Sequence, residues 1–246
     1  MKKIFSLVLL LAATGYVSAQ NVQLHYDLGH TFCSDLSNRP SVTTTVEMFK
    51  PDGWGNTFLF IDIDYFGDGV AGAYWEISRE FNVTKNKMFA AHVEYDGGVA
   101  SSQLNDMSTR FQHAFLAGAA WNWHSSDFSK TFSLQALYKY HFKGQYAYNR
   151  PFSSFQATAV WGIDFAHGLC TFSGFADFWY DQNVRGNWIF LSEPQFWFNL
   201  SALKGWEKVK LSLGSEVELS NNFVWDKNGR NDRFYAIPTI AAKWTF

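Results

Sequence analysis

Apolar and polar side chains alternate along most of the chain, and residues 54–66 (WGNTFLFIDIDYF) show the pattern most clearly. Leu59, Ile61 and Ile63 share one face of an extended chain, whereas Asp62 and Asp64 share the other. Successive side chains of a β-strand point to opposite faces, so a period of two predicts a strand with one apolar face. The two carboxylates therefore face away from the aliphatic side chains and avoid the cost of burying an unpaired charge.

The same alternation recurs in many segments, and helical periodicity is almost absent. The further predicted strands cover residues 20–30, 41–50, 73–83, 89–95, 110–123, 132–141, 155–164, 172–180, 193–200, 208–217 and 233–246. Gly, Asn and Asp clusters separate these segments, as expected for turns. We therefore predict an all-β fold of about 12 strands in one domain, residues 20–246.

Short and long connections alternate between these strands. Short turns are predicted at 51–53, 84–87, 125–127, 166–168 and 201–205. Longer polar links are predicted at 31–40, 96–108, 143–151, 181–187 and 220–232, and 67–69 is a brief member of this second set. Turns at one rim and loops at the other are typical of a transmembrane antiparallel up-and-down β-barrel. An even strand number places both chain ends at the rim with the short turns, which would be the periplasmic side.

Composition favours a membrane barrel over a soluble one. The 246 residues are 47% hydrophobic and 19% aromatic, and only 17% are charged. A barrel of about 12 strands is too wide for side chains to fill, so an apolar interior would leave a void. The apolar side chains are therefore predicted to face lipid, with aromatic pairs such as Trp121 and Trp123 near strand ends. The net charge of -2 offers no basic surface for nucleic acid.

Both ends of the chain carry export features. Lys2 and Lys3 precede the apolar run 4–13, and 17–19 (VSA) resembles a cleavage site, so residues 1–19 are predicted to be a signal peptide. That run is too short for a membrane helix. The chain ends in Phe246 on the apolar face, which is similar to the signal read by the outer-membrane barrel assembly machinery. We expect outer-membrane localisation, with that machinery and the membrane lipids as partners.

The polar face of the predicted strands would line the lumen, and acids outnumber bases on it. The inward acids are Asp27, Glu47, Asp62, Asp64, Glu76, Glu80, Glu94, Asp164, Asp177, Glu193 and Glu216. The inward bases are Arg110, Lys139, Lys208, Lys210, Arg233 and Lys243. Such a lumen should repel phosphate-bearing solutes and admit neutral or cationic ones. Crowded acids also need counter-charges, for which Arg110, Lys208 and Lys210 are the candidates.

Several segments resemble the nucleoside-specific channel-forming proteins of the Gram-negative outer membrane, the Tsx family. The matching segments are VTTTVEMFKPDGW at 42–54, YWEISREFNVTK at 74–85, FSLQALYKY at 132–140, FSGFADFW at 172–179 and the final strand. The loops are shorter than in that family, which affects the choice of substrate more than the fold. The resemblance implies a narrow channel, lined by aromatic and ionisable residues, through which nucleosides diffuse passively.

Inward aromatic and charged residues form the candidate solute site. An aromatic ring could stack a nucleobase or a sugar with about 1–3 kcal/mol, and carboxylates could accept hydrogen bonds from ribose hydroxyls. The candidates are Glu47, Phe49, Phe58, Phe60, Asp62, Asp64, Glu76, Arg110, Phe175, Asp177, Trp179, Trp197, Lys210 and Tyr235. For each of them the alternative is a cross-strand pair that only stiffens the barrel.

Two other functions stay open. One is an outer-membrane enzyme that acts on lipid. Such an enzyme would resemble the outer-membrane phospholipases and would need a Ser-His-Asn arrangement on the lipid-facing side of the barrel. His113 is the histidine with lipid-facing parity, but no serine stands two residues beyond it. A plugged barrel without transport activity is the second alternative.

We expect no catalysis, no cofactor and no metal site. Cys33 and Cys170 are too few and too far apart in the sequence for a disulfide framework or a metal cluster. The inward histidines His25, His92 and His141 lack metal-ligand spacing.

Overall fold

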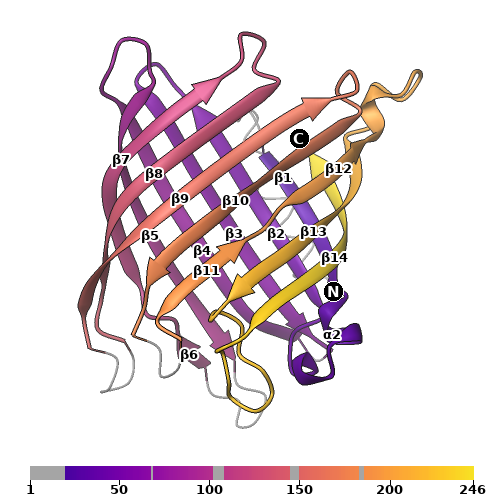
Figure 1. Cartoon of the computed structure of the whole chain (residues 1–246). Coiled ribbons are helices and arrows are strands. Elements are labelled where there is room, and N and C mark those ends of the chain that lie inside the picture. The colour runs from indigo at the N-terminus through magenta and orange to yellow at the C-terminus, as the bar shows by residue number, and fades with distance from the viewer. Residues whose placement is uncertain (1–19, 68, 102–107, 145–149, 183–185) are drawn as a thin grey trace.

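A computed structural model describes residues 20–67, 69–101, 108–144, 150–182 and 186–246 (Figure 1). The strands are β1 (Gln20–Asp27), β2 (Val42–Pro51), β3 (Gly55–Phe66), β4 (Gly69–Asn82), β5 (Phe89–Ser101), β6 (Ser108–Arg110), β7 (Ala114–His124), β8 (Lys130–His141), β9 (Phe152–Phe165), β10 (Cys170–Tyr180), β11 (Trp188–Ser192), β12 (Gln195–Asn199), β13 (Leu211–Asn221) and β14 (Phe234–Thr245). Short helical segments lie in the connections: α2 (Gly29–Phe32), η1 (Ser34–Leu36) and η2 (Leu200–Ala202). The predicted signal peptide, residues 1–19, lies outside the described residues and stays a prediction.

The strands close into one antiparallel barrel. β1 pairs with both β2 and β14, and β9 pairs with β10, so the sheet has no free edge. β6 and β7 pair in succession with β5, and β11 and β12 pair in succession with β10. Each of these two couples forms one interrupted strand, and the result is the predicted 12-stranded barrel.

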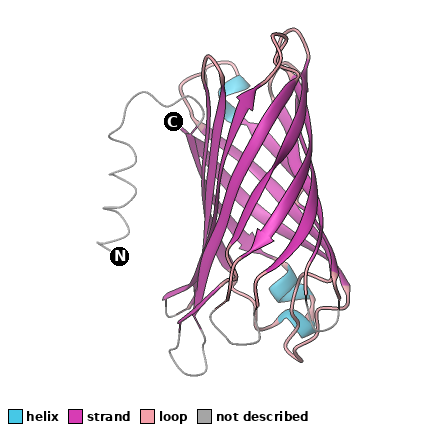
Figure 2. Ribbon diagram, turned by 90° about the vertical axis from the view of Figure 1, so that its left-hand side faces the viewer, coloured by secondary structure: helices cyan, strands magenta, loops and turns pink. Residues whose placement is uncertain are grey.

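Short and long connections gather at opposite ends of the barrel. We call the end with the turns 52–54, 84–88, 125–129 and 166–169 the turn rim, and the other end the loop rim. The strands are strongly tilted, and the helical segments lie beyond their ends (Figure 2). Phe246 donates its backbone N–H to the carbonyl of Gln20, so the first and the last strand of the barrel meet at the turn rim.

The outer wall is apolar and the inner wall is polar. Leu134 and Ile240 point outward with 46% and 63% of their surface exposed. Gln23 and Glu80 point inward and are buried. Soluble proteins show the reverse distribution, so the outer wall is built to face lipid. None of the helices among the described residues is long and apolar enough to cross a membrane.

The strand predicted at 193–200 is only the second half of an interrupted strand. β11 supplies the first half, and the register with β10 continues unchanged across the break. Pro194 has no N–H to donate to the ladder, which explains the interruption. Apolar and polar residues do not alternate in the sequence of β11, because its inward residues Ile189 and Leu191 are apolar and pack against Trp179.

A bulge between β6 and β7 reverses the predicted parity there. Two β5 residues, Gly97 and Gly98, oppose three residues, 111–113, on the other strand. An extra residue moves the following side chains to the other face. Phe111 was predicted to face lipid, but its ring centroid lies 6.1 Å from that of Tyr74 inside the lumen.

Candidate functional site

The aspartates of residues 54–66 are paired with threonines across the β2–β3 ladder. Thr43 donates its hydroxyl to Asp64 at 2.6 Å, and Thr45 donates to Asp62 at 2.5 Å. The register places each threonine directly opposite its aspartate. Hydrogen bonds to a carboxylate stabilise its charged form, so the threonines of β2 reduce the cost of placing these two carboxylates on β3.

Aromatic rings form a continuous ladder beside these acids. The centroids of Phe58 and Phe60 lie 6.0 Å apart, and Phe60 lies 6.0 Å from Tyr74. Phe111 extends the ladder from Tyr74. Tyr74 also donates its hydroxyl to Glu76 at 2.8 Å. The ladder therefore offers ring faces and a carboxylate along one wall of the lumen.

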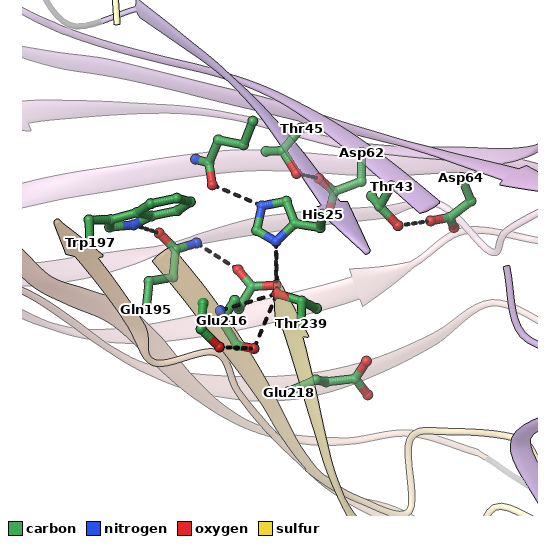
Figure 3. Close-up of polar contacts among 12 residues, drawn as sticks. His25, Thr43, Thr45, Asp62, Asp64, Gln195, Trp197, Glu216, Glu218 and Thr239 are labelled. Atoms are coloured by element: carbon green, nitrogen blue, oxygen red, sulfur yellow. Dashed lines mark hydrogen bonds and ion pairs between the residues drawn. The ribbon is translucent and has the colours of Figure 1, made fainter. Parts of the chain in front are cut away.

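A linked polar network runs across β12, β13, β14 and β1 (Figure 3). Trp197 donates its indole N–H to Gln195 at 2.9 Å, and Gln195 donates to Glu216 at 2.6 Å. His25 of β1 lies 3.8 Å from the same carboxylate and contacts Thr239 at 3.2 Å. Lys243 covers the Trp197 ring at 4.2 Å from its centroid. Trp197 is consequently fully buried, and its predicted stacking face is occupied by protein.

A second network joins β5, β8, β9 and β10. Lys139 donates to Asp96 at 3.1 Å and to Gln156 at 2.8 Å, and its ammonium lies 5.2 Å from the Trp179 ring centroid. Thr158 donates to Asp177 at 2.5 Å. Buried ions are stable only when they are paired and hydrogen-bonded, and Lys139 meets that condition through three strands.

Glu80 and His92 form a third group. His92 contacts Glu80 at 3.3 Å through Nδ1 and Glu94 at 3.0 Å through Nε2. Asn56 and Asn122 donate to the other oxygen of Glu80 at 3.0 and 2.8 Å. Both carboxylate oxygens of Glu80 therefore have partners within the protein, so Glu80 is part of the barrel wall and is not a free lumenal acid.

The carboxylates of opposing walls repel one another across the lumen. Glu193, between β11 and β12, interacts electrostatically with Asp62 of β3 and Glu76 of β4 as well as with Glu216. Glu216 in turn interacts with Asp62 and Glu47. Acidic groups from both walls therefore lie close enough to repel one another across the lumen.

Arg39 supplies a counter-charge that the sequence pattern did not predict. It lies in the loop-rim connection 28–41 and donates to Asp27 at 3.0 Å and to Glu218 at 2.8 Å. Burial by itself would lower the pKa of the Arg39 guanidinium, but Glu218 and Asp27 outweigh it and raise that pKa. The segment is held in place by Leu36, which is buried among Val224, Tyr235 and Ile237.

The lumenal roles predicted for Lys210 and Arg110 stay predictions. Lys210 precedes β13 at the turn rim and is exposed, and Lys208 lies in the same exposed stretch. The backbone register pairs Arg110 of β6 with Val99 of β5. The side chain of Arg110 lies outside the described part of the chain. The described residues that provide counter-charges to lumenal acids include Arg39, Lys139 and Lys243.

The other predicted site residues have the predicted inward parity but differ in access. Phe49 pairs with Phe58 near the turn rim and is 41% exposed. Glu47 accepts a hydrogen bond from Asn21 at 3.2 Å. Phe175 packs against the buried cluster around Trp179. Tyr235 is buried beneath the 28–41 segment and donates its hydroxyl to Asp35 at 2.9 Å.

Asp96 and Glu218 were missed because both predicted strands ended too early. Asp96 was placed in a loop and Glu218 beyond the end of its strand, whereas β5 and β13 continue through them. The signal was present, since Glu94-x-Asp96 and Glu216-x-Glu218 continue the inward parity. Arg39 has no such signal, because it reaches the lumen from a connection.

His113 lies on the outer face, as its parity predicted. Its Nδ1 is hydrogen-bonded to the hydroxyl of Tyr95, and its ring lies 6.5 Å from that of Trp75. The partner of this imidazole is therefore a phenol rather than the serine of a hydrolytic triad.

Comparisons with solved structures show the fold. The NanC porin superposes with a TM-score of 0.57 at 9% sequence identity, over 93% of this chain and 100% of that chain. The KdgM porin gives 0.48 at 7% identity over 92% and 98%, and LpxR from Salmonella typhimurium gives 0.45 at 8% identity over 93% and 100%. At these identities the similarity to NanC establishes a shared barrel architecture only.

No curated protein matches the chain in sequence. One family, described as a domain of unknown function (DUF5020), matches residues 19–246. The match spans the whole barrel, whereas the resemblance to the Tsx family stays a prediction. The chain, a closed 12-stranded β-barrel with an acidic and aromatic lumen, belongs to the DUF5020 family.

Proposed function

We propose that this protein is an outer-membrane channel for passive diffusion of small neutral solutes, with nucleosides as the favoured class. The observation that carries the proposal is the ring ladder from Phe58 through Phe60 to Tyr74, flanked by the carboxylates of Asp62 and Glu76. Nucleosides combine a flat aromatic base with hydroxyl and amino donors. The aromatic rings of the ladder can stack on the base, and the carboxylates can accept hydrogen bonds from the donors.

The lumenal charge supports exclusion of anionic solutes. Acids outnumber the described cations, and acids of opposite walls interact across the lumen. A phosphate group would approach several carboxylates in a region with few positive partners. Neutral nucleosides would avoid that repulsion, whereas nucleotides would not.

The apolar outer wall and the predicted signal peptide support insertion in an outer membrane. A 12-stranded barrel with an apolar exterior suits the bacterial outer membrane. Phe246 is exposed on the outer face at the end of the closing strand, where barrel assembly machinery could recognise it. The shared architecture with NanC, a porin, agrees with a channel rather than a plug.

Single-channel conductance of the refolded protein in planar bilayers tests the proposal. We expect adenosine and thymidine to block the current saturably, and glucose and AMP to have little effect. Phe60→Ala should weaken block by the loss of one stacking face, worth about 1–3 kcal/mol, and Asp62→Asn should weaken it less. Phe155→Ala, on the lipid-facing side of β9, is the matched control and should leave block unchanged.

Each contrary result has a distinct meaning. Open channels that none of the four solutes blocks would refute nucleoside recognition and keep the channel. A folded, inserted barrel that carries no current would refute the channel itself.

A further inference from the structure

Three carboxylates from adjacent strands converge on the lumenal face of β4 and β5. Glu76 pairs directly with Asp96 in the ladder, and Glu94 lies two residues from Asp96 on the same face. One oxygen from each of the three lies within 4.8 Å of the others. The group was not predicted from the sequence, because Asp96 was assigned to a loop.

Each carboxylate is oriented by a donor from a neighbouring position. Tyr74 donates to Oε1 of Glu76 at 2.8 Å, His92 contacts Oε2 of Glu94 at 3.0 Å, and Lys139 donates to Oδ2 of Asp96 at 3.1 Å. Such partners fix ligand side chains in metal sites by holding one oxygen while the other remains available.

Among the described residues, no donor reaches the second oxygen of Asp96. Asp96 is 4% exposed, and its Oδ1 is buried without a hydrogen bond to any of the residues that the structure describes. A buried carboxylate oxygen without a partner is costly, because it has lost its water and gained nothing in exchange. The missing partner has to be positive or a donor, and it has to fit among the acids.

The cations that the structure describes do not neutralise the group. Lys139 and His92 contact it, while Glu80 accepts from the same His92 and Asp177 adds repulsion from β10. Even with His92 charged, the five carboxylates outnumber the two cations in contact with them among the described residues. The excess negative charge favours a multivalent cation.

We propose that Glu76, Glu94 and Asp96 form a binding site for a hard divalent cation of the Ca²⁺ class. Carboxylate oxygens are the ligands that such cations prefer. Oxygens on opposite sides of a Ca²⁺ shell are about 4.6–5.2 Å apart, which accommodates the observed spread, whereas the smaller Mg²⁺ shell is more restrictive. Water in the lumen would complete the coordination.

Calorimetric titration of the refolded, detergent-solubilised protein with CaCl₂ and with MgCl₂ tests the site. We expect saturable Ca²⁺ binding that is tighter than Mg²⁺ binding. Glu76→Gln and Asp96→Asn, which keep shape and remove charge, should each weaken Ca²⁺ binding by about 10-fold to 100-fold. Asp164→Asn removes an inward acid at the turn rim, bonded to Thr171, and should have no effect.

Lys139→Gln gives an effect of opposite sign. Glutamine keeps a donor that can hold Asp96 in place but removes the positive charge that repels a bound cation, so Ca²⁺ binding should strengthen several-fold, which a purely structural role for the acids would not produce. Circular dichroism and heat-modifiable gel mobility confirm that each variant is folded. Equal Ca²⁺ affinity in wild type, Glu76→Gln and Asp96→Asn would overturn the proposal, as would the absence of Ca²⁺ binding to the folded wild-type protein.

The site does not depend on transport. Calorimetry detects the cation whether or not the barrel conducts, so failure of the channel proposal and failure of the cation proposal are separate results. If the barrel conducts, millimolar Ca²⁺ should reduce its current, and Asp96→Asn should relieve that block.

Discussion

Arg39 shows how one side chain can shape the lumen from outside the strand pattern. It enters from the connection 28–41 and bridges Asp27 of β1 to Glu218 of β13. A guanidinium presents several donors in a rigid plane, so it can hold two carboxylates at once where a lysine ammonium is less suited. The mouth of the barrel at the loop rim therefore contains a fixed positive group in an acidic surrounding.

Arg39→Gln should increase the preference for cations and destabilise the barrel. Two partly buried carboxylates would lose their partner, and the free energy of unfolding should fall by about 2 kcal/mol, less than for a fully buried pair. The side chain is 25% exposed, which reduces the penalty. Reversal potentials in a KCl gradient and urea unfolding measure the two effects.

Arg39→Lys is the matched control because it keeps the charge and loses the planar fork. It should preserve ion selectivity while losing part of the stability. Equal selectivity in wild type and Arg39→Gln would show that Arg39 does not contribute to the field in the lumen.

Asp127 organises a turn at the turn rim through hydroxyl and amide donors. Ser125 donates to its Oδ1 at 2.6 Å, and Ser129 donates through its hydroxyl at 2.9 Å and its N–H at 3.1 Å. The hydrogen bond from Ser125 and those from Ser129 lower the pKa of Asp127 from 3.8 to about 2. Because the folded pKa is lower, the contribution to stability is present above the unfolded value and is lost as pH falls from 3.8 through about 2.

Asp127→Asn should therefore be less stable than wild type at pH 7 and equal to it near pH 2. Urea unfolding midpoints at a series of pH values measure the difference. Ser126→Ala in the same turn is the control and should follow wild type throughout. A difference between Asp127→Asn and wild type that is constant with pH would contradict the role assigned to the charged carboxylate.

At the scale of elements, the local alternation of apolar and polar residues predicted which segments form strands, but it did not predict where a strand is interrupted. The alternation predicted the barrel strands because lipid outside and polar lumen inside impose opposite side-chain chemistry on successive residues. It failed for β11, where apolar packing at Ile189 and Leu191 replaces the polar side, and after β6, where the bulge exchanges the faces. The error at Phe111 comes from that single inserted residue.

The interruption between β11 and β12 depends on the glycine that faces it. Gly174 of β10 has a φ of 150°, and a Cβ there would lie 2.4 Å from the carbonyl oxygen of Glu193. Only glycine adopts such a backbone without strain, and no side-chain atom can occupy that space.

Gly174→Ala should lower the free energy of unfolding by about 1–3 kcal/mol, from backbone strain and the close contact. Urea unfolding followed by tryptophan fluorescence measures the change. Gly53→Ala, in a turn where an added Cβ would meet nothing within 4 Å, is the control. Equal stability of the two variants would indicate that the break tolerates a side chain.

At the scale of the whole molecule, the two faces of one strand meet different surroundings. Leu134 and Gln135 are consecutive in β8, and they face lipid and lumen respectively. The surrounding solvent therefore changes from hydrocarbon to water within one residue of the chain.

Leu134→Arg should destabilise the barrel by about 2–4 kcal/mol, since an arginine on the lipid face near the bilayer centre is expensive. Gln135→Arg should cost much less, because the lumen is hydrated and acidic. Unfolding in urea from lipid vesicles compares the two. Similar losses for both variants would contradict the assignment of the faces.

The sequence alone determined that the chain forms a 12-stranded barrel, which rim carries the turns, and which face of most strands is polar. Those properties follow from a period of two and from turn residues, which are local. Only the tertiary structure decided which charges meet. Arg39 reaches the lumen from a connection, Lys139 bonds to an acid beyond the adjacent strand, and Asp96 joins Glu76 by register. Contacts of this kind depend on barrel closure and strand register, and no local pattern encodes the distance between residues far apart in the chain.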